Sequence, residues 1–356
     1  MTVIVFLLVL GLAAANGAND IPKGVATLAA AGVTKIRTAL IWGTIATVAG
    51  CLTSLTFASK LTELFSKGIV SAKPTPEFAI AVLVGSAAWV ALATIRRLPV
   101  STTHALVGAL LGAGTVLSAK SVHWNVLAIK VAQPMLLSVL IAFVISALFA
   151  IVWQRLVLRS LIRRATAPAP TTPSLVGAGG VATATAPETD PAPSPAPDAQ
   201  PAVRLGVVGA LHWLTAGLTS FARGLNDTPK IVAIGSFALI SGMTAQTLLF
   251  TVTAAMAIGG LAAGSRIAKC MCCCVVKMPH VEGFMANLTT ATLVGLGALR
   301  GLPMSTTHVS VGAIAGTAGT DVSRLQTKTL RDFAMAWLVT PPFAAAVAAG
   351  TLLLIG

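Results

Sequence analysis

The chain has 356 residues, of which 56% are hydrophobic and only 10% are charged, and its formal net charge is +14. Soluble globular domains contain roughly 25% charged residues, so this composition excludes a soluble domain and indicates a polytopic membrane protein. The basic residues stand at the ends of apolar runs, as they do in the cytoplasmic loops of membrane proteins, so the positive charge does not predict nucleic-acid binding.

Five membrane elements are expected in the first half of the chain. The first run, from Thr2 to about Gly32, is long enough to cross a hydrocarbon core of about 30 Å, since a helix rises about 1.5 Å per residue. The fourth run, Ala105 to Gly114, consists of small residues and is too short to cross, which predicts a half-helix or a re-entrant hairpin. The five runs cover about residues 2–32, 38–58, 77–95, 105–114 and 125–157.

A change of composition divides the chain in two. Residues 165–203 are dominated by Ala, Pro, Thr and Gly. Such a segment cannot bury enough apolar area to offset its ordering entropy, which predicts a disordered linker. The domain organisation expected is therefore a membrane repeat at 1–164, a Pro/Ala-rich linker at 165–203 and a second membrane repeat at 204–356.

The second half repeats the motifs of the first in the same order. An Asn-Asp pair occurs at Asn19-Asp20 and at Asn226-Asp227, and a Ser-Thr-Thr-His segment ends at His104 and at His308. Five elements per half is an odd number, so the halves should have opposite orientations. The expected fold is an all-α polytopic membrane protein of about 10 to 12 segments, with two inverted-topology repeats, broken helices and re-entrant or half-helix hairpins.

The distribution of basic residues predicts the orientation. Basic residues follow the first, third and fifth runs, which places those loops and the linker inside and both termini outside. Lys60, Lys67 and Lys73 follow the second run and contradict this assignment. The overall expectation is a multi-pass protein of the plasma (inner) membrane.

Each Asn-Asp pair lies within an apolar run, together with Gly, Pro and Lys. A carboxylate at bilayer depth costs about 2.5–3.5 kcal/mol on insertion scales, which indicates a functional use. The Gly and Pro residues predict that the helix is broken there, since unwound backbone is tolerated where it is buried in protein or lines a wet cavity. Hard oxygen ligands suit a small cation such as Na⁺, so the predicted cation ligands are Asn19, Asp20, Asn226 and Asp227. The alternative is that these polar groups only hold neighbouring helices together.

Each Ser-Thr-Thr-His segment precedes a helix of small residues. A helix N-terminus presents unpaired N–H donors and about half a positive charge, and hydroxyls add neutral donors. Two such ends meeting at the midplane would enclose a tetrahedral oxyanion. The predicted ligands are Ser101, Thr102, Thr103, Ser305, Thr306 and Thr307. The alternative is simple helix capping. His104 and His308 would orient the hydroxyls, shuttle protons or pack as neutral rings.

The motifs resemble the twin signatures of the inorganic phosphate transporter (PiT) family. They are Gly-Ala-Asn-Asp at residues 17–20, Gly-Leu-Asn-Asp at 224–227, Pro-Val-Ser-Thr-Thr-His at 99–104 and Pro-Met-Ser-Thr-Thr-His at 303–308. The resemblance implies a secondary active transporter and homodimer that imports inorganic phosphate with Na⁺ or H⁺. It also implies that the Ser-Thr-Thr segments hold phosphate and the Asn-Asp pairs hold cations.

The chain departs from the usual signature of this family after each Asp. The family has small residues and a second Asn, whereas this chain has Ile-Pro-Lys and Thr-Pro-Lys ending at Lys23 and Lys230. Our hypothesis is that the two ammonium groups act as tethered counter-ions, which would reduce the number of Na⁺ ions needed or favour proton coupling. The alternative is an Asp-Lys pair that only neutralises the site.

Three other functions remain open at this stage: a permease for sulfate or another tetrahedral oxyanion, a passive anion channel, and an intramembrane hydrolase using Ser101 or Ser305 with a histidine. Two equivalent copies argue against the hydrolase, so no enzyme activity is expected. We expect no cofactor, and no metal beyond a transported cation. The cysteines of residues 270–274 lack a distant partner pair and are interpreted as incidental.

Overall fold

A computed structural model describes residues 1–71, 75–165, 206–238, 243–274 and 280–356. These residues are almost entirely helical, and Val70 and Val122 form an isolated antiparallel bridge. The predicted linker, apart from its first residue, lies outside the described residues.

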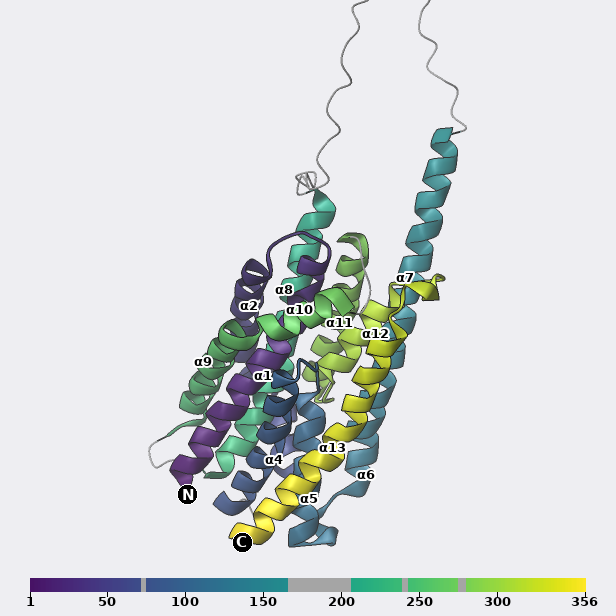
Figure 1. Ribbon diagram of the computed structural model, residues 1–356. Coiled ribbons are helices and arrows are strands. Elements are labelled where there is room, and N and C mark those ends of the chain that lie inside the picture. The colour runs from purple at the N-terminus through teal and green to yellow at the C-terminus, as the bar shows by residue number, and fades with distance from the viewer. Residues whose placement is uncertain (72–74, 166–205, 239–242, 275–279) are drawn as a thin grey trace, which may run out of the picture.

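The first half contains five helices that build the bundle (Figure 1). Between them lie short helical segments: α3 (Ser59–Glu63), a π-helical segment (Leu64–Gly68), a 3-10 turn (Ala119–Ser121), α6 (Trp124–Val126) and a second π-helical segment (Leu127–Ala132). The main helices are α1 (Thr2–Ala30), α2 (Ile36–Phe57), α4 (Pro76–Ile95), α5 (Thr102–Leu117) and α7 (Gln133–Ala165).

The second half follows the same order of elements. A short amphipathic helix, α10 (Ser265–Cys274), takes the place that α3 and its π-helical extension have in the first half. The main helices are α8 (Val207–Gly235), α9 (Ala245–Ala263), α11 (His280–Arg300), α12 (Thr306–Gly316) and α13 (Thr327–Ile355).

Six helices in the described part of the chain are long and apolar enough to cross a membrane. The outward side chains of α7 show what surrounds them, because Leu136, Leu140 and Leu148 are 64%, 62% and 57% exposed. Exposed leucines at this density belong against lipid rather than water. The chain is therefore a helical membrane protein, as its composition predicted.

Capping residues begin α4, α5 and α12. Thr75 accepts a hydrogen bond from the backbone N–H of Phe78 at 3.2 Å, and Pro76 occupies the first position of α4, where its missing N–H is harmless. Ser101 and Ser305 cap α5 and α12 in the same way. The half-length helices expected after each Ser-Thr-Thr-His segment are thus present, with 16 and 11 residues.

The prediction of a broken helix at each Asn-Asp pair was wrong. α1 continues through Pro22, and α8 continues through Pro229. A proline removes one backbone hydrogen bond, but both helices are buried on all sides around the motif, from Asn16 to Leu28 in α1. Packing around the whole circumference holds the helical backbone and overrides the local preference for a break.

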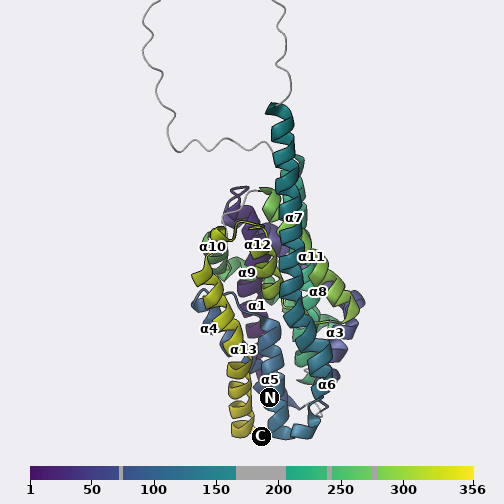
Figure 2. The ribbon, with the colours of Figure 1, turned by 90° about the vertical axis from the view of Figure 1, so that its right-hand side faces the viewer.

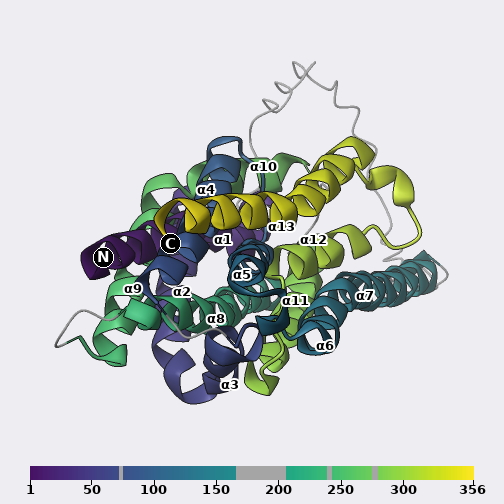
Figure 3. The ribbon, with the colours of Figure 1, turned by 90° about the horizontal axis from the view of Figure 1, so that it is seen from below.

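Helices of the two halves pack closely against each other at glycines. A Cβ added to Gly112 of α5 would lie 2.1 Å from the carbonyl oxygen of Ala345 in α13, and one added to Gly316 of α12 would lie 2.3 Å from that of Phe143 in α7. Helix backbones approach this closely in membranes only where residues are small. Each half-helix is therefore covered by the last helix of the other half, and α5 lies near the middle of the bundle (Figure 3).

Candidate functional site

The N-termini of α5 and α12 meet inside the bundle. Thr103 Oγ1 donates to the carbonyl of Met304 at 3.3 Å, and Thr307 Oγ1 donates to the carbonyl of Val100 at 2.7 Å. The rings of His104 and His308 lie 4.4 Å apart. From this meeting point the two helices run towards opposite ends of the bundle (Figure 1). The structure thus brings together all six predicted oxyanion ligands, and every one of them is buried.

The two asparagines of the Asn-Asp pairs hold the extended segments that precede α5 and α12. Asn19 Oδ1 accepts from the backbone N–H of Val100 at 3.1 Å, and Asn226 Oδ1 accepts from that of Met304 at 3.2 Å. The amide nitrogen of Asn19 also donates to the carbonyl of Leu98 at 3.0 Å. These side chains, predicted as cation ligands, therefore position the oxyanion segment of their own half.

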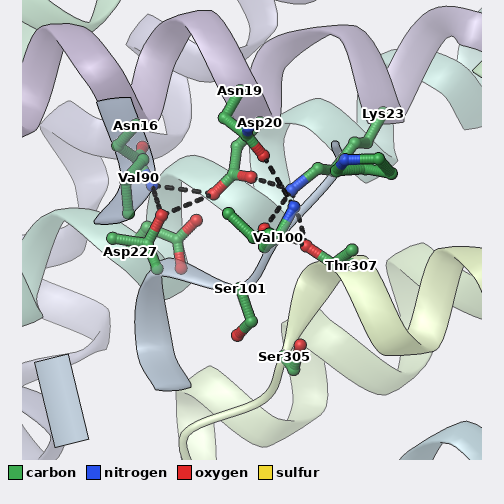
Figure 4. A network of polar contacts seen from close by, with 12 residues as sticks. Asn16, Asn19, Asp20, Lys23, Val90, Val100, Ser101, Asp227, Ser305 and Thr307 are labelled. Atoms are coloured by element: carbon green, nitrogen blue, oxygen red, sulfur yellow. Dashed lines mark hydrogen bonds and ion pairs between the residues drawn. The ribbon is translucent and has the colours of Figure 1, made fainter. Parts of the chain in front are cut away.

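The two lysines reach across from one half to the other. Lys23 pairs with Asp20 and donates to the carbonyl of Val100 at 2.6 Å and to Thr307 Oγ1 at 2.5 Å (Figure 4). Lys230 makes the corresponding contacts, to Asp227 Oδ1 at 3.2 Å and to Thr103 Oγ1 at 2.7 Å. Each ammonium group thus joins its own aspartate to the third hydroxyl of the opposite Ser-Thr-Thr segment.

The two aspartates differ in how fully they are bonded. Asp20 Oδ2 accepts from Asn16 Nδ2 at 2.7 Å and from Thr102 Oγ1 at 3.2 Å, while Oδ1 pairs with Lys23. Asp227 Oδ1 accepts from Asn226 and Lys230, but within the described residues Oδ2 has no hydrogen-bond partner. Asp227 is therefore the aspartate with an oxygen available to a further ligand.

Two residues of this network were missed by the sequence analysis. Asn16 and Arg223 occupy the same position in the two copies, four residues before each Asp. The Arg223 side chain is 1% exposed and donates from Nη2 to Thr47 Oγ1 at 2.6 Å, while Nε and Nη1 have no partner among the described residues. Residues four apart share one helix face, so this spacing is a signal that could have identified them.

The serines and histidines are arranged for capping and packing. The Ser101 and Ser305 hydroxyl oxygens accept from the backbone N–H of His104 and His308, at 3.2 and 3.3 Å. The His308 ring also lies 4.0 Å from that of Trp337. A nucleophilic serine needs a hydrogen bond to the imidazole of its base, and no such bond occurs between these groups in the part of the chain that the structure describes.

The site is suited to an anion. Its buried charged residues are two lysines, one arginine and two aspartates, a formal net charge of +1. Hydroxyl groups from both copies and two helix N-termini add neutral donors to that positive charge. The ranges that the structure describes contain no cluster of three His, Cys, Asp or Glu side chains that would hold a metal ion. The side chains of Cys272 to Cys274 are not among those that the structure describes.

Comparisons with known proteins agree with this chemistry. The sequence model of the Phosphate transporter family matches residues 16–348. A protein of Rhizobium meliloti (strain 1021), described as a "Probable low-affinity inorganic phosphate transporter", is 27% identical over 344 residues, which cover 94% of this chain and 90% of that protein. A protein of Mycobacterium tuberculosis (strain ATCC 25618 / H37Rv) with the same description is 27% identical over 347 residues, covering 94% of this chain and 73% of that protein.

A solved structure described as "The sodium-dependent phosphate transporter" has the same fold, with a TM-score of 0.69 over 99% of this chain and 98% of that chain, at 21% identity. The family and these relatives are transporters and not enzymes. The family model matches residues 16–348, a range that contains both copies of each motif and the meeting of α5 and α12. The chain therefore belongs to the Phosphate transporter family.

Proposed function

We propose that the protein imports inorganic phosphate across the plasma (inner) membrane by secondary active transport. The observation that carries this proposal is the meeting of two helix N-termini, with hydroxyls from both copies and a lysine from each half at one buried place. The relatives in Rhizobium meliloti and Mycobacterium tuberculosis, named as phosphate transporters, support this substrate.

Phosphate would be held by the hydroxyls of Ser101, Thr102, Thr103, Ser305, Thr306 and Thr307. Lys23 and Lys230 each donate to the third hydroxyl of the opposite segment, so both ammonium groups lie within reach of an anion bound there. Hydroxyls and two ammonium groups release an anion more readily than a bidentate arginine clamp would. Such an arrangement suits transport better than permanent binding.

We propose two inverted-topology repeats as the framework for alternating access. Two observations support this architecture. α5 and α12 run in opposite directions, and each packs against the last helix of the other half. Ten membrane segments follow if α8 and α11 cross and if α5 and α12 enter from opposite faces, in addition to the six apolar helices. We also propose that the protein works as a homodimer, as the family resemblance implies.

The driving ion would be Na⁺ or H⁺, acting at the aspartates. Asp227 Oδ2 is the buried carboxylate oxygen without a partner in the described ranges, so it is our first candidate for the ion site. In this proposal Lys23 and Lys230 are tethered counter-ions that replace part of the cation requirement. The description of the structural neighbour as sodium-dependent supports testing Na⁺ first.

The test is uptake of radiolabelled phosphate into proteoliposomes under a Na⁺ gradient alone and under a proton gradient alone. Accumulation above equilibrium under one gradient, with protein-free liposomes as control, is the expected result and names the driving ion. Strong competition by excess unlabelled sulfate would change the substrate to a different tetrahedral oxyanion. Equilibration without accumulation under both gradients would contradict secondary active transport and favour a channel.

A further inference from the structure

Two basic cavities flank the bundle away from the buried site. The first, which we name the α3 pocket, has a volume of about 530 Å³ and is lined by Lys60, Glu63, Lys67, His123, Lys130 and Arg300, with apolar neighbours. The second, the α10 pocket, has a volume of about 360 Å³ and is lined by Arg97, Ser265, Arg266, Lys269 and Cys270. Basic residues outnumber acidic ones in both.

The two pockets correspond under the internal duplication, and each combines the two halves. In the α3 pocket, the short helix of the first half lies against the turn of residues 300–302 in the second half. In the α10 pocket, the short helix of the second half lies against Arg97, in the equivalent turn of the first half. α10 lies in the upper part of the bundle and α3 in the lower part (Figure 2).

Each pocket borders the turn that leads into a Ser-Thr-Thr segment. Leu302 lines the α3 pocket and precedes Ser305 by three residues, and Arg97 lines the α10 pocket and precedes Ser101 by four. A group bound in either pocket would therefore lie next to the turn before one of the two extended segments, which carry the hydroxyls proposed to bind phosphate.

The backbone conformation of the two turns is also equivalent. Gly301 has a left-handed φ of 73°, and the equivalent residue Arg97 has a φ of 61°. Glycine adopts this conformation freely, whereas for another residue it costs roughly 1–2 kcal/mol. In both copies this conformation ends a helix, because the backbone N–H of Leu98 donates to the carbonyl of Ala93 at 2.8 Å and that of Leu302 to the carbonyl of Gly297 at 2.9 Å.

The charges of the α3 pocket are also not balanced locally. In the described ranges, no carboxylate lies within 4.0 Å of the basic nitrogens of Lys60, Lys67, Lys130 or Arg300. α3, which lines the pocket, lies towards the end of the bundle that holds both termini, the end expected to face outside (Figure 2). The preference for basic residues on the inner face therefore does not account for Lys60 and Lys67, which contradicted the predicted orientation.

We propose that the α3 pocket is a binding site for a phosphate group, and that the α10 pocket is its counterpart at the opposite face. Clustered cations in a cavity of low-dielectric walls concentrate anions and raise their rate of association. Its use as a loading site for transported phosphate rests on the proposed function, whereas binding itself does not. A phosphate group could come from free inorganic phosphate or from the headgroup of an anionic lipid, and the test separates the two.

The test compares two triple variants with the same loss of charge. The pocket variant is Lys60→Gln/Lys67→Gln/Lys130→Gln, and the control variant is Lys35→Gln/Lys120→Gln/Lys328→Gln, whose three lysines are exposed and line neither pocket. Equilibrium binding of radiolabelled inorganic phosphate is measured on the full chain in nanodiscs of phosphatidylcholine. The wild type and the control variant are expected to show a weaker class of site that the pocket variant lacks.

Uptake and lipid retention complete the test. In proteoliposomes, the pocket variant is expected to raise the KM for phosphate about threefold to tenfold relative to the control variant, with a smaller change in maximal rate. If the source is lipid, phosphatidic acid will be retained by the wild type and the control variant, but not by the pocket variant, in native mass spectrometry. Equal phosphate binding and equal lipid retention in both triple variants would overturn the proposal. Binding without any uptake by the wild type would leave it intact and contradict the proposed transport.

Discussion

Lys23 Nζ of α1 donates a hydrogen bond at 2.5 Å to Thr307 Oγ1 of α12, a residue 284 positions further along the chain. Lys230 and Thr103 repeat the contact in the other direction at 2.7 Å. The two halves are therefore tied together at the hydroxyls proposed to hold the substrate, so a change in either lysine should affect ion coupling as well as binding.

Replacing Lys23 should change the ion dependence of uptake. In Lys23→Asn, the Asp20 carboxylate loses its ammonium partner, so a cation from solution must balance the buried charge. We expect initial rates to depend more steeply on the driving ion, Na⁺ or H⁺, than in the wild type. Rates should be normalised to folded protein measured by size-exclusion chromatography.

The control for this experiment is Lys35→Asn, since Lys35 is exposed and stands at the start of α2, just after the end of α1. Its ion dependence should match the wild type. The same steepness in the wild type and in Lys23→Asn would show that the lysine only neutralises Asp20 and would end the counter-ion hypothesis.

The third hydroxyl of each segment should contribute to phosphate affinity. Thr103→Val and Thr307→Val keep the side-chain volume but remove the hydroxyl, whose oxygen accepts a hydrogen bond from a lysine. A hydrogen bond to a charged group contributes about 1.5–3 kcal/mol, so each variant should raise the KM for phosphate about 10-fold to 150-fold. Thr53→Val is the matched control, because Thr53 bonds only to carbonyls of its own helix. A KM within twofold of the control would contradict the assignment.

Replacing the two aspartates by asparagine should have different effects on stability and on ion-dependent uptake. Both replacements leave a buried ammonium group without its carboxylate, but Asp20→Asn also disturbs the hydrogen bonds that Asp20 accepts from Asn16 and Thr102, so it should cost ~3–5 kcal/mol of stability. Asp227 has one unpartnered oxygen in the described ranges, so Asp227→Asn should lower stability less while removing the dependence on the driving ion. Thermal unfolding in detergent and ion-dependent uptake measure the two effects. An equal loss of stability in both variants would refute the asymmetry.

Close packing of α5 on α13 gives a prediction about stability alone. In Gly112→Ala, the new methyl group would meet the carbonyl oxygen of Ala345, and relieving the clash should cost about 1–3 kcal/mol. Gly350→Ala on α13 is the control, because a Cβ there meets nothing within 4 Å. The control should unfold at or slightly above the wild-type temperature, since alanine favours the helix. Equal unfolding temperatures would mean that the helices separate more easily than their packing suggests.

The sequence predicted the parts of this site that depend on local chemistry. Ser101 and Ser305 begin α5 and α12 as expected, because capping and helix length are readable from neighbouring residues. The continuity of α1 through Pro22 was not predicted, because burial on all sides, rather than local preference, decides it. The pairing of Lys23 with Thr307 was also out of reach, since a duplication does not say which copy contacts which.

The glycines of α5 and α12 have a consequence for how the duplicated halves can change. Gly112 is covered by α13 and Gly316 by α7, so the surface that matches each glycine is encoded in the opposite copy. A larger residue at either position would require a compensating change roughly half a chain away. The two copies can therefore differ in sequence, as they do at Asn16 and Arg223. Each half-helix, however, must keep a surface that fits the last helix of the other copy.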